Sequence, residues 1–458
     1  MVLFHSVRAG ALALVMCSVP ALAHAETLRE ALTSAYTNNP SILSALLNVK
    51  ATAENIALAK SAKLPTIGAS ASLGTTYVAP SATTGADATF PTSLTVGASL
   101  NQNIFDNFKS DADIEAARAL TEASRYSLQN SEQNVLLAVV QAYWGVIQNT
   151  QLVKLAQDNV AFYQAQVNSS NDRLKIGEGT KIDVSQAQAR LAQGSAAYEA
   201  AVAALQTSQA SYERYVGHKP KNLVSTYKVG SLLPKSLDIA INEAVASHPA
   251  VLAAKAAIRA SQANSDSANA AFGPTLDLTS AIGTGATFLP GVGTSLSQPS
   301  ASVKLSLSVP IYTGGALSSN IRKANLNQIK SEVDALATRD QVKESLITAW
   351  STLQSATAQI ASANSAVSSG QLSLEGTVQE RDVGQATTLD VLNAQSELTA
   401  VKESLIQATS SKAIATFAVI AATGHLTASD LGLNVQVKTG EDYIAKVEDV
   451  WQEIRALD

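Results

Sequence analysis

Acidic side chains stand at equivalent positions in the two halves of the 458-residue chain. Asp183 follows the helix-breaking residue Gly177, and Asp390 follows Gly384. A glycine that ends one helix, followed by an acid, is typical of the start of the next helix, where a side-chain oxygen accepts backbone hydrogen bonds. The predicted chemistry at both places is therefore helix capping. The candidate caps are Asp183, Thr387, Thr388 and Asp390.

Catalytic chemistry has little support elsewhere in the sequence. The five histidines have no metal-site spacing, and His5 and His24 lie in the N-terminal signal. His218 and His425 follow matching glycines, which is typical of helix C-termini. The sequence contains no G-x-S-x-G and no P-loop motif. We therefore expect no enzymatic activity and no cofactor.

The first residues read as a secretory signal peptide. Arg8 precedes a short apolar stretch, and Ala23-His24-Ala25 is typical of a cleavage site, so the mature chain is expected to begin at Glu26. Cleavage removes the only cysteine, Cys17, and with it any disulfide or thiol chemistry. No later stretch reaches the length of a transmembrane helix. The net charge of −5 becomes −6 without Arg8, which argues against nucleic acid as a partner.

One structural unit of roughly 190 residues is built twice, a self-similarity typical of repeat folds. The run Leu28–Pro40 returns as Leu237–Pro249, at an offset of 209 residues. Gly217-His218 returns as Gly424-His425, at an offset of 207 residues. We therefore expect a pseudo-symmetric molecule whose function lies on the symmetry axis.

Each half is predicted to contain helix, strand, strand, long helix and helix. Residues 28–64 and 237–272 have a helical period, with an Asn-Pro or His-Pro step near the start and a proline at the end. From Lys109 to Arg173 there is no proline, which predicts a helix on the order of 100 Å long. Shorter helices are expected over about 183–216 and 390–423. Apolar residues recur every seven positions, as in a coiled coil; they are Val139, Val146, Val153, Val160 and Val167, then Leu346, Leu353, Ile360, Val367 and Leu374.

Between these helices the pattern alternates with a period of two, which predicts strands. The predicted strands are Thr66–Val78, 94–100, Thr275–Phe288 and 303–309, with loops at 79–91 and 289–299. Alternation alone would also suit an ordinary soluble hairpin. Apolar residues facing small polar ones, with aromatic residues at the strand ends, favour a membrane barrel. These aromatic residues are Tyr77, Phe90, Phe105, Phe108, Phe272, Phe288 and Tyr312.

Four strands cannot close a barrel, and lipid does not tolerate an open sheet edge. Two copies would give eight strands around a plugged interior, whereas three would give twelve strands around an aqueous lumen. Each half also offers one long helix and two shorter ones that can stack end to end. We therefore expect a mixed α and β membrane protein: a trimeric 12-stranded β-barrel, four strands per chain, continuing into a 12-column α-barrel.

The chain resembles the TolC-type outer-membrane channels of tripartite efflux and type I secretion systems. The resemblance extends from Glu26 to about His425 and rests on the Leu28–Pro40 run and the helix breaks Arg173–Val184 and Val383–Leu392. It implies a homotrimer in the outer membrane of a Gram-negative bacterium, extending into the periplasm. It also implies a periplasmic adaptor (membrane fusion) protein and an inner-membrane pump or ABC transporter as partners. Small molecules or proteins would pass from the periplasm to the exterior.

The resemblance places a pore constriction at the periplasmic tip. Asp390 takes the position of the ring acid, and Asp183 that of the matching acid on the outer helix pair. Asn393 stands where a second acid is usual, so three charges are expected in the trimer instead of six. Ala386 replaces a basic residue and Arg381 an aromatic one, so the gate network of Asp183, Arg381 and Ala386 is expected to differ from the family pattern. The helix breaks at the tip are Gly177, Gly179 and Gly384.

A periplasmic coiled-coil adaptor or scaffold without a pore is the alternative interpretation, since heptads alone would permit it. The resemblance also implies an equatorial belt, which includes an amphipathic helix bearing Ile444, Val447, Trp451 and Ile454. The predicted segments are 1–25 (signal peptide), 26–64 (helix), 65–105 (hairpin), 106–217 (long helix and coiled-coil helices), 218–236 (equatorial linker), 237–273 (helix), 274–312 (hairpin), 313–425 (long helix and coiled-coil helices) and 426–458 (equatorial segment).

Overall fold

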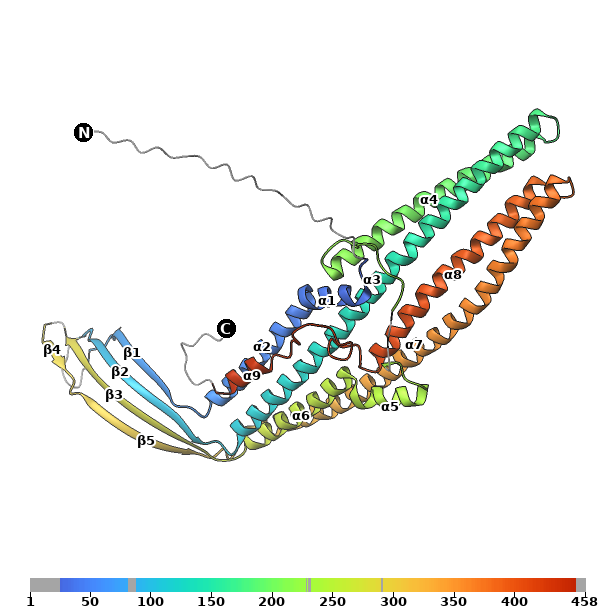
Figure 1. Ribbon diagram of the computed structural model, residues 1–458. Helices are drawn as coiled ribbons and strands as arrows, with labels where there is room; N and C mark the ends of the chain where they lie inside the picture. Colours follow the sequence, from blue (N-terminus) through green and yellow to red (C-terminus); the bar gives the residue numbers. More distant parts are fainter. Residues whose placement is uncertain (1–24, 81–87, 228, 230–231, 290, 450–458) are drawn as a thin grey trace, which may run out of the picture.

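The computed structural model of the chain describes residues 25–80, 88–227, 229, 232–289 and 291–449. Figure 1 shows an elongated arrangement, with a β-sheet at one end and two helical hairpins projecting at the other. α1, α5 and the C-terminal segment lie around the middle of the molecule. The predicted signal peptide up to residue 24, and both Trp451 and Ile454, lie outside the described residues.

The two halves repeat the same series of helices. Those of the first half are α1 (Leu28–Asn38), α2 (Pro40–Ser61), α3 (Lys109–Lys175) and α4 (Lys181–Val216). Those of the second half are α5 (Leu237–Ser247), α6 (Pro249–Ala270), α7 (Ala316–Asp382) and α8 (Thr388–Ala422), with the short α9 (Glu441–Glu448) after them. A proline at the first position of α2 and of α6 separates each from the helix before it.

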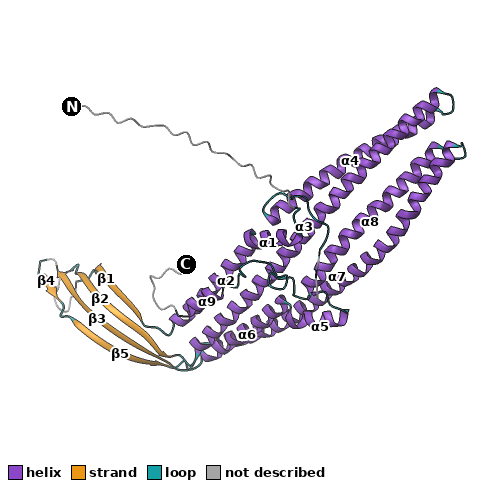
Figure 2. Ribbon diagram, viewed as in Figure 1, coloured by secondary structure: helices purple, strands orange, loops and turns teal. Residues whose placement is uncertain are grey.

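The two long helices form the body of the molecule. α2 and α4 pack along α3, and α6 and α8 pack along α7, which gives each half the two-column arrangement visible in Figure 2. Within the predicted seam, Val139, Val146 and Val167 of α3 and Leu346 and Leu374 of α7 are buried. The seven-residue repeat therefore marks the packed side of both long helices.

One helix departs from the expectation that nothing after the signal could span a membrane. α8 is long and apolar enough to do so by length and composition, and half of its most apolar window is buried. Phe417 and Ile420 of α8 belong to the main hydrophobic core, which they share with α1 and α3. The apolar character of α8 is therefore explained by its packing inside the protein.

The sheet contains one strand more than predicted. Its antiparallel strands are β1 (Thr66–Thr75), β2 (Thr92–Phe105), β3 (Thr275–Leu289), β4 (Gly293–Leu296) and β5 (Ser300–Ser308). β4 lies in the expected loop 289–299, and it pairs with the same edge of β3 as β5 does. Pro299 has no backbone N–H to donate, so the ladder is interrupted between β4 and β5. The sheet therefore has four strand positions, in the order β1, β2, β3 and β4/β5.

One face of this sheet is apolar and the other polar. Residues paired across antiparallel strands lie on the same face, and one row across the sheet consists of Leu73, Leu94, Ala286 and Leu296. The next row, on the opposite face, contains Ser72, Thr95 and Gly285. The aromatic residues predicted at the strand ends are all exposed; for example, the Phe108 side chain is 68% exposed. The alternation predicted for the strands is therefore present in their register.

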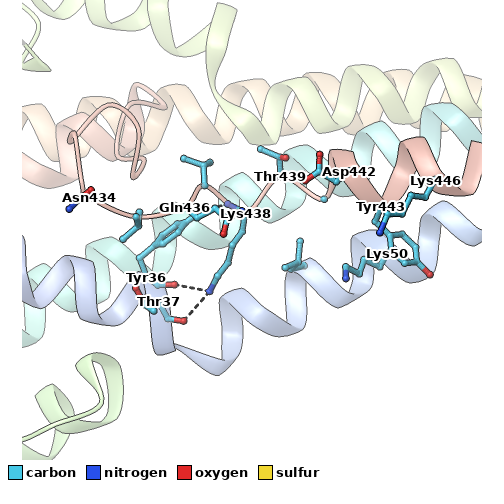
Figure 3. A pocket seen from close by; sticks show the side chains of 14 residues that line it. Tyr36, Thr37, Lys50, Asn434, Gln436, Lys438, Thr439, Asp442, Tyr443 and Lys446 are labelled. Carbon is cyan, nitrogen blue, oxygen red and sulfur yellow. Dashed lines mark hydrogen bonds between the residues drawn. The ribbon is translucent and has the colours of Figure 1, made fainter. Parts of the chain in front are cut away.

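The main core lies at the middle of the molecule, where α1, α3 and the ends of α4 and α8 meet the segment after α8. This segment lies across α1: the Nζ of Lys438 donates to the carbonyl oxygens of Tyr36 and Thr37, both at 3.0 Å (Figure 3). At its end α9 buries Val447, and Glu448 binds Lys60 and Arg118. The C-terminal segment is thus fastened along α1, α2 and α3.

Candidate functional site at the helical tips

The two hairpin tips are built alike. Gly177 and Gly384 have φ angles of +83° and +79°, values that residues other than glycine rarely adopt. A Cβ atom on Gly179 would lie 3.2 Å from the Cβ of Arg173, so the first turn is closely packed. In the second turn Ala386 takes the equivalent place, and its N–H bonds to a carbonyl of α7 at 3.3 Å. Ala386 has no polar side-chain atom, so it adds only this backbone contact to the tip.

Each tip acid completes a capping box. Thr180 and Thr387 are the N-caps of α4 and α8, which confirms Thr387 as a cap. Asp183 is corrected from a cap to the third residue of α4, where its carboxylate accepts from the Thr180 N–H at 2.9 Å and from the Thr180 hydroxyl at 2.6 Å. Asp390 accepts from Thr387 in the same way, at 2.8 and 2.6 Å. A helix begins before its capping-box acid because the preceding threonine takes the N–H at that position.

Asp390 is exposed and charged at neutral pH. The hydrogen bonds from the Thr387 side chain and backbone hold the pKa of Asp390 below its usual value, because they favour the ionised form. Asn393, one turn further along α8, is also exposed, and its Oδ1 accepts from Arg190 of α4 at 3.0 Å. A single chain therefore presents one carboxylate and one amide at the predicted constriction.

Arg381 joins the end of α7 to α3. Only 8% of its surface is exposed, and its Nη1 donates to Oε1 of Gln166 at 2.6 Å. Its Nε and Nη2 donate to Asp382 at 3.1 and 2.7 Å. Within the described part of one chain, Asp183 and Arg381 make separate contacts, so a link between them stays a prediction for an assembly.

Further polar contacts between the hairpins were not predicted. Oδ1 of Asn159 on α3 accepts from Gln395 Nε2 at 3.0 Å and from Thr399 Oγ1 at 3.3 Å. Gln395 and Thr399 are both buried on α8. With Gln166 and Arg190, these residues connect the α3–α4 hairpin to the α7–α8 hairpin.

The sequence did carry a signal for two of these residues. Asn159 and Gln166 lie seven residues apart, and each directly precedes a seam valine, Val160 or Val167. Residues that flank the seam of a coiled coil commonly set which helices pair. The spacing of Asn159 and Gln166 could have identified them as contacts between helices.

Comparison with known proteins decides the family. The outer membrane efflux protein family matches residues 31–218 and 240–425, once for each half. The chain belongs to this family. It is 39% identical over 438 residues to the outer membrane efflux protein BepC of Brucella suis, covering 94% of this chain and 93% of that protein. It is 24% identical over 448 residues to the outer membrane protein TolC of Escherichia coli, covering 93% and 88% of the two chains.

Solved structures agree on the fold. The CmeC outer membrane channel of Campylobacter jejuni superimposes with a TM-score of 0.78 at 17% identity, covering 93% of this chain and 90% of that one. The predicted resemblance to TolC-type channels is confirmed. The chain is an outer-membrane exit duct for efflux or type I secretion, and the alternative of a periplasmic scaffold without a pore finds no support.

Proposed function

We propose that three copies of this chain close into one channel, with a 12-stranded barrel above a 12-column helical barrel. The observation that carries this proposal is the open sheet. Within the described residues, the outer edges of β1 and of β4/β5 pair with no further strand. Unpaired backbone groups at these edges could not remain in lipid, so each edge requires the opposite edge of another copy.

The faces of the sheet support its place in the membrane. Apolar side chains on one face remain largely exposed in the single chain, for example Val303 at 77% and Leu305 at 62%. Lipid would cover this face, and the face of serine, threonine and glycine would line an aqueous lumen. The exposed aromatic residues would then lie at the two membrane interfaces.

The helical part also presents an uncovered apolar stripe. Leu326, Ile329, Val333 and Leu336 of α7 follow one another at three- and four-residue spacing, and each is more than half exposed. Leu43 and Leu47 of α2 are likewise exposed, at 49% and 55%. Exposed stripes of this kind are typical of helices that pack against another chain. Neighbouring copies in a trimer would cover them.

The gate is proposed at the tips. Three Asp390 carboxylates would ring the pore next to Asn393, and the contacts of Arg381 with Gln166 and of Arg190 with Asn393 would hold the two hairpins of each chain together. Asp183 would stabilise the outer tip. The left-handed turns at Gly177 and Gly384, with the close packing at Gly179, would let the hairpins reverse within a few residues.

The same tips are the proposed contact for an adaptor. Ile176, Ile182 and Val383 are exposed by 70, 68 and 72% at the turns. Apolar side chains at the end of a periplasmic helical barrel suit a periplasmic adaptor protein, which would connect the channel to an inner-membrane pump or ABC transporter. Cargo selection would then rest with those partners.

Cysteine cross-linking tests the closure, because the predicted mature chain has no cysteine. Ser70→Cys on β1 would be combined in turn with Ser300→Cys, Ser302→Cys or Ser306→Cys on β5. Oxidation should give ladders that end at three chains. Ser72→Cys with Thr95→Cys is the matched control, since these residues are paired within one chain and should not link copies. A ladder that ends at two chains, or no link between copies in any register, would refute the trimer.

A further inference from the structure

The chain segments that follow α4 and α8 are held in the same way. Gly217 and Gly424 end these helices with φ angles of +94° and +89°. Four residues beyond each glycine, a buried carboxylate from another element accepts a backbone N–H: Glu26 accepts from Lys221 at 3.2 Å, and Glu132 accepts from Ala428 at 2.6 Å. We call residues 217–224 the α4 root and residues 424–431 the α8 root.

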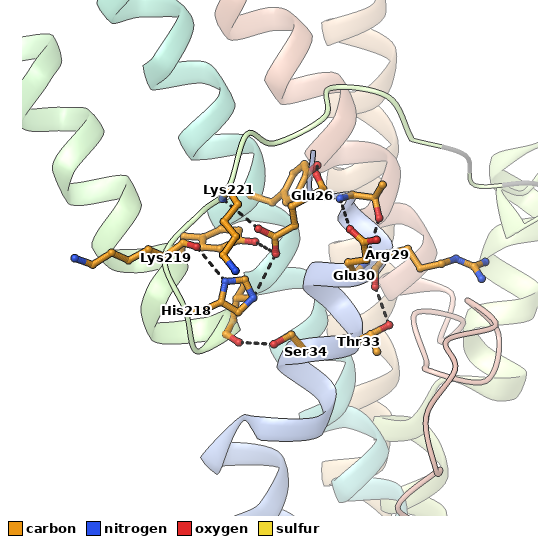
Figure 4. Close-up of polar contacts among 12 residues, drawn as sticks. Glu26, Arg29, Glu30, Thr33, Ser34, His218, Lys219 and Lys221 are labelled. Atoms are coloured by element: carbon orange, nitrogen blue, oxygen red, sulfur yellow. Dashed lines mark hydrogen bonds and ion pairs between the residues drawn. The ribbon is translucent and has the colours of Figure 1, made fainter. Parts of the chain in front are cut away.

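The carboxylate at the α4 root has several partners. Glu26 is 7% exposed and accepts from the Tyr212 hydroxyl at 2.6 Å, and His218 Nε2 lies 3.4 Å from it (Figure 4). Its backbone N–H also donates to the Lys221 carbonyl at 3.1 Å. Such a carboxylate is well satisfied although it is buried.

The carboxylate at the α8 root has fewer hydrogen-bond partners among the described residues. Glu132 of α3 is 4% exposed, and in the described part of the chain its hydrogen bond is the one from Ala428. Beside it, Gln133 donates to the carbonyl of Gly424. The titratable and charged groups facing Glu132 are Asp430 of the root, Lys438 of the C-terminal segment and Tyr36 of α1; His425 lies 3.5 Å from Asp430.

We propose that Glu26 and Glu132 are positioning residues that hold the C-terminal ends of α4 and α8. We further propose that proton binding by Glu132 sets how firmly the α8 root is docked against α3. α8 carries Asp390 at its other end, so release of the root would free the helix that bears the proposed constriction. Only this effect on the constriction rests on the proposed gate. The docking itself lies within one chain.

The direction of the pH effect follows from burial. Desolvation raises the pKa of Glu132 from 4.5 to about 7, with a further contribution from Asp430 and opposing ones from Ala428 and Lys438. A released root would return Glu132 to water and to its ordinary pKa, so protonation favours the docked form. Docking is fully supported below pH 4.5 and weakens as the pH rises through about 7. The ratio of released to docked roots should rise by up to about tenfold per pH unit in this window and then level off.

Hydrogen–deuterium exchange of the full-length mature protein in detergent tests this. Protection of peptides covering 424–431 and 217–224 would be compared from pH 5 to pH 8, after correction for intrinsic exchange. The wild-type α8 root should lose protection as the pH rises. Glu132→Gln keeps an acceptor for the Ala428 N–H but cannot titrate, so its α8 root should have a flat profile.

Matched variants keep the test decisive. Glu26→Ala should weaken the α4 root and leave the pH profile of the α8 root unchanged. Glu132→Asp should retain the pH dependence at lower protection, and it substitutes for Glu132→Gln if that variant does not assemble. The same pH profile at the α8 root in the wild type and in Glu132→Gln would overturn the proposal. Single-channel recordings at pH 6 and 8 address the gate separately: an open fraction that is independent of pH, with a pH-dependent root, would refute the coupling but not the channel.

Discussion

Replacement of Arg381 by alanine should loosen the contact between the two hairpins of each chain. The guanidinium donates to Gln166 at 2.6 Å, and both residues are less than 10% exposed. The variant would leave the Gln166 carbonyl buried with no charged donor. The other partner of Arg381 is Asp382, whose side chain is 59% exposed, so the Arg381–Asp382 ion pair contributes little to stability.

The magnitude follows from these contacts. A buried hydrogen bond to a charged group contributes about 1.5–3 kcal/mol, and each 1.4 kcal/mol is tenfold in an equilibrium constant. If the contact exists only while the hairpins are together, Arg381→Ala should raise the ratio of separated to joined hairpins by roughly 10- to 150-fold per chain. Arg381→Lys should show an intermediate effect, because it keeps the charge but loses the planar fork.

A double-mutant cycle in planar bilayers measures this effect. The open fraction of single channels would be recorded for Arg381→Ala, Gln166→Ala and the double variant. Lys175→Ala is a nearby control, because Lys175 pairs with Asp172 on its own helix. The double variant should open no more often than the stronger single variant. Additive effects of the two substitutions, or unchanged opening in all of them, would show that this contact does not hold the tips together.

Three further predictions concern the sheet, the ring and the C-terminal clamp. Leu305→Arg and Val96→Arg should impair assembly, since arginine near the bilayer midplane costs about 2–4 kcal/mol. Ser306→Arg on the polar face should assemble normally. Equal yields of heat-resistant trimer from the variants of the two faces would contradict this assignment of faces. Asp390→Ala should reduce cation preference and divalent block in single-channel recordings while trimers persist. An unchanged reversal potential in the variant would remove Asp390 from the pore. Glu448→Gln should release α9, seen as faster proteolysis after residue 440. In the wild type, Arg118 and Lys60 lower the pKa of Glu448 to about 2, so the stabilisation by this clamp is complete above pH 4.5 and is lost as the pH falls toward 2. Release of α9 in the wild type above pH 4.5 would contradict this prediction.

Much of the architecture could be predicted because it depends on local, repeated signals. The offset between the halves, the proline before each strand pair and the seven-residue spacing of the valines each act over a short stretch of chain. β4 was missed because its residues are mostly small and polar, and its pairing is set by β3 rather than by its own sequence. The N-cap of α4 was placed three residues late, and that of α8 was left among three candidates, because a threonine and an acid in the same turn can both cap, and only the backbone angles decide between them.

The contacts of the gate were harder to predict, since they join residues far apart in the chain. Gln166 and Arg381 are separated by 215 positions, and Asn159 and Gln395 by 236. Arg381 was noticed as a departure from the family pattern, but nothing in the sequence named its partner. Glu132 likewise gave no signal, because a single acid in a long polar-and-apolar helix is usually solvated, and its burial depends on how the segment after α8 folds back.

The duplication separates the residues that build a tip from those that join the two tips. The turn and capping residues recur at the constant offset of 207: Gly177 with Gly384, Thr180 with Thr387, Asp183 with Asp390. Most of the residues that connect the hairpins differ at that offset, although Gln395 has an identical counterpart in Gln188. Their counterparts in the other half are Leu174 for Arg381, Ser373 for Gln166, Glu397 for Arg190 and Ala366 for Asn159.

This division has a physical reason. The hairpins meet through different faces, with α3 and α4 of one packed against α8 of the other, so the residue at the equivalent position of the other half does not have the same neighbour. A contact across such an interface needs a donor on one face and an acceptor on the other, so its residues need not recur in the two halves. Replacing Arg381 by the leucine of its counterpart position should thus leave each capping box intact while the hairpins separate, which amide exchange at the two tips can measure independently of channel opening.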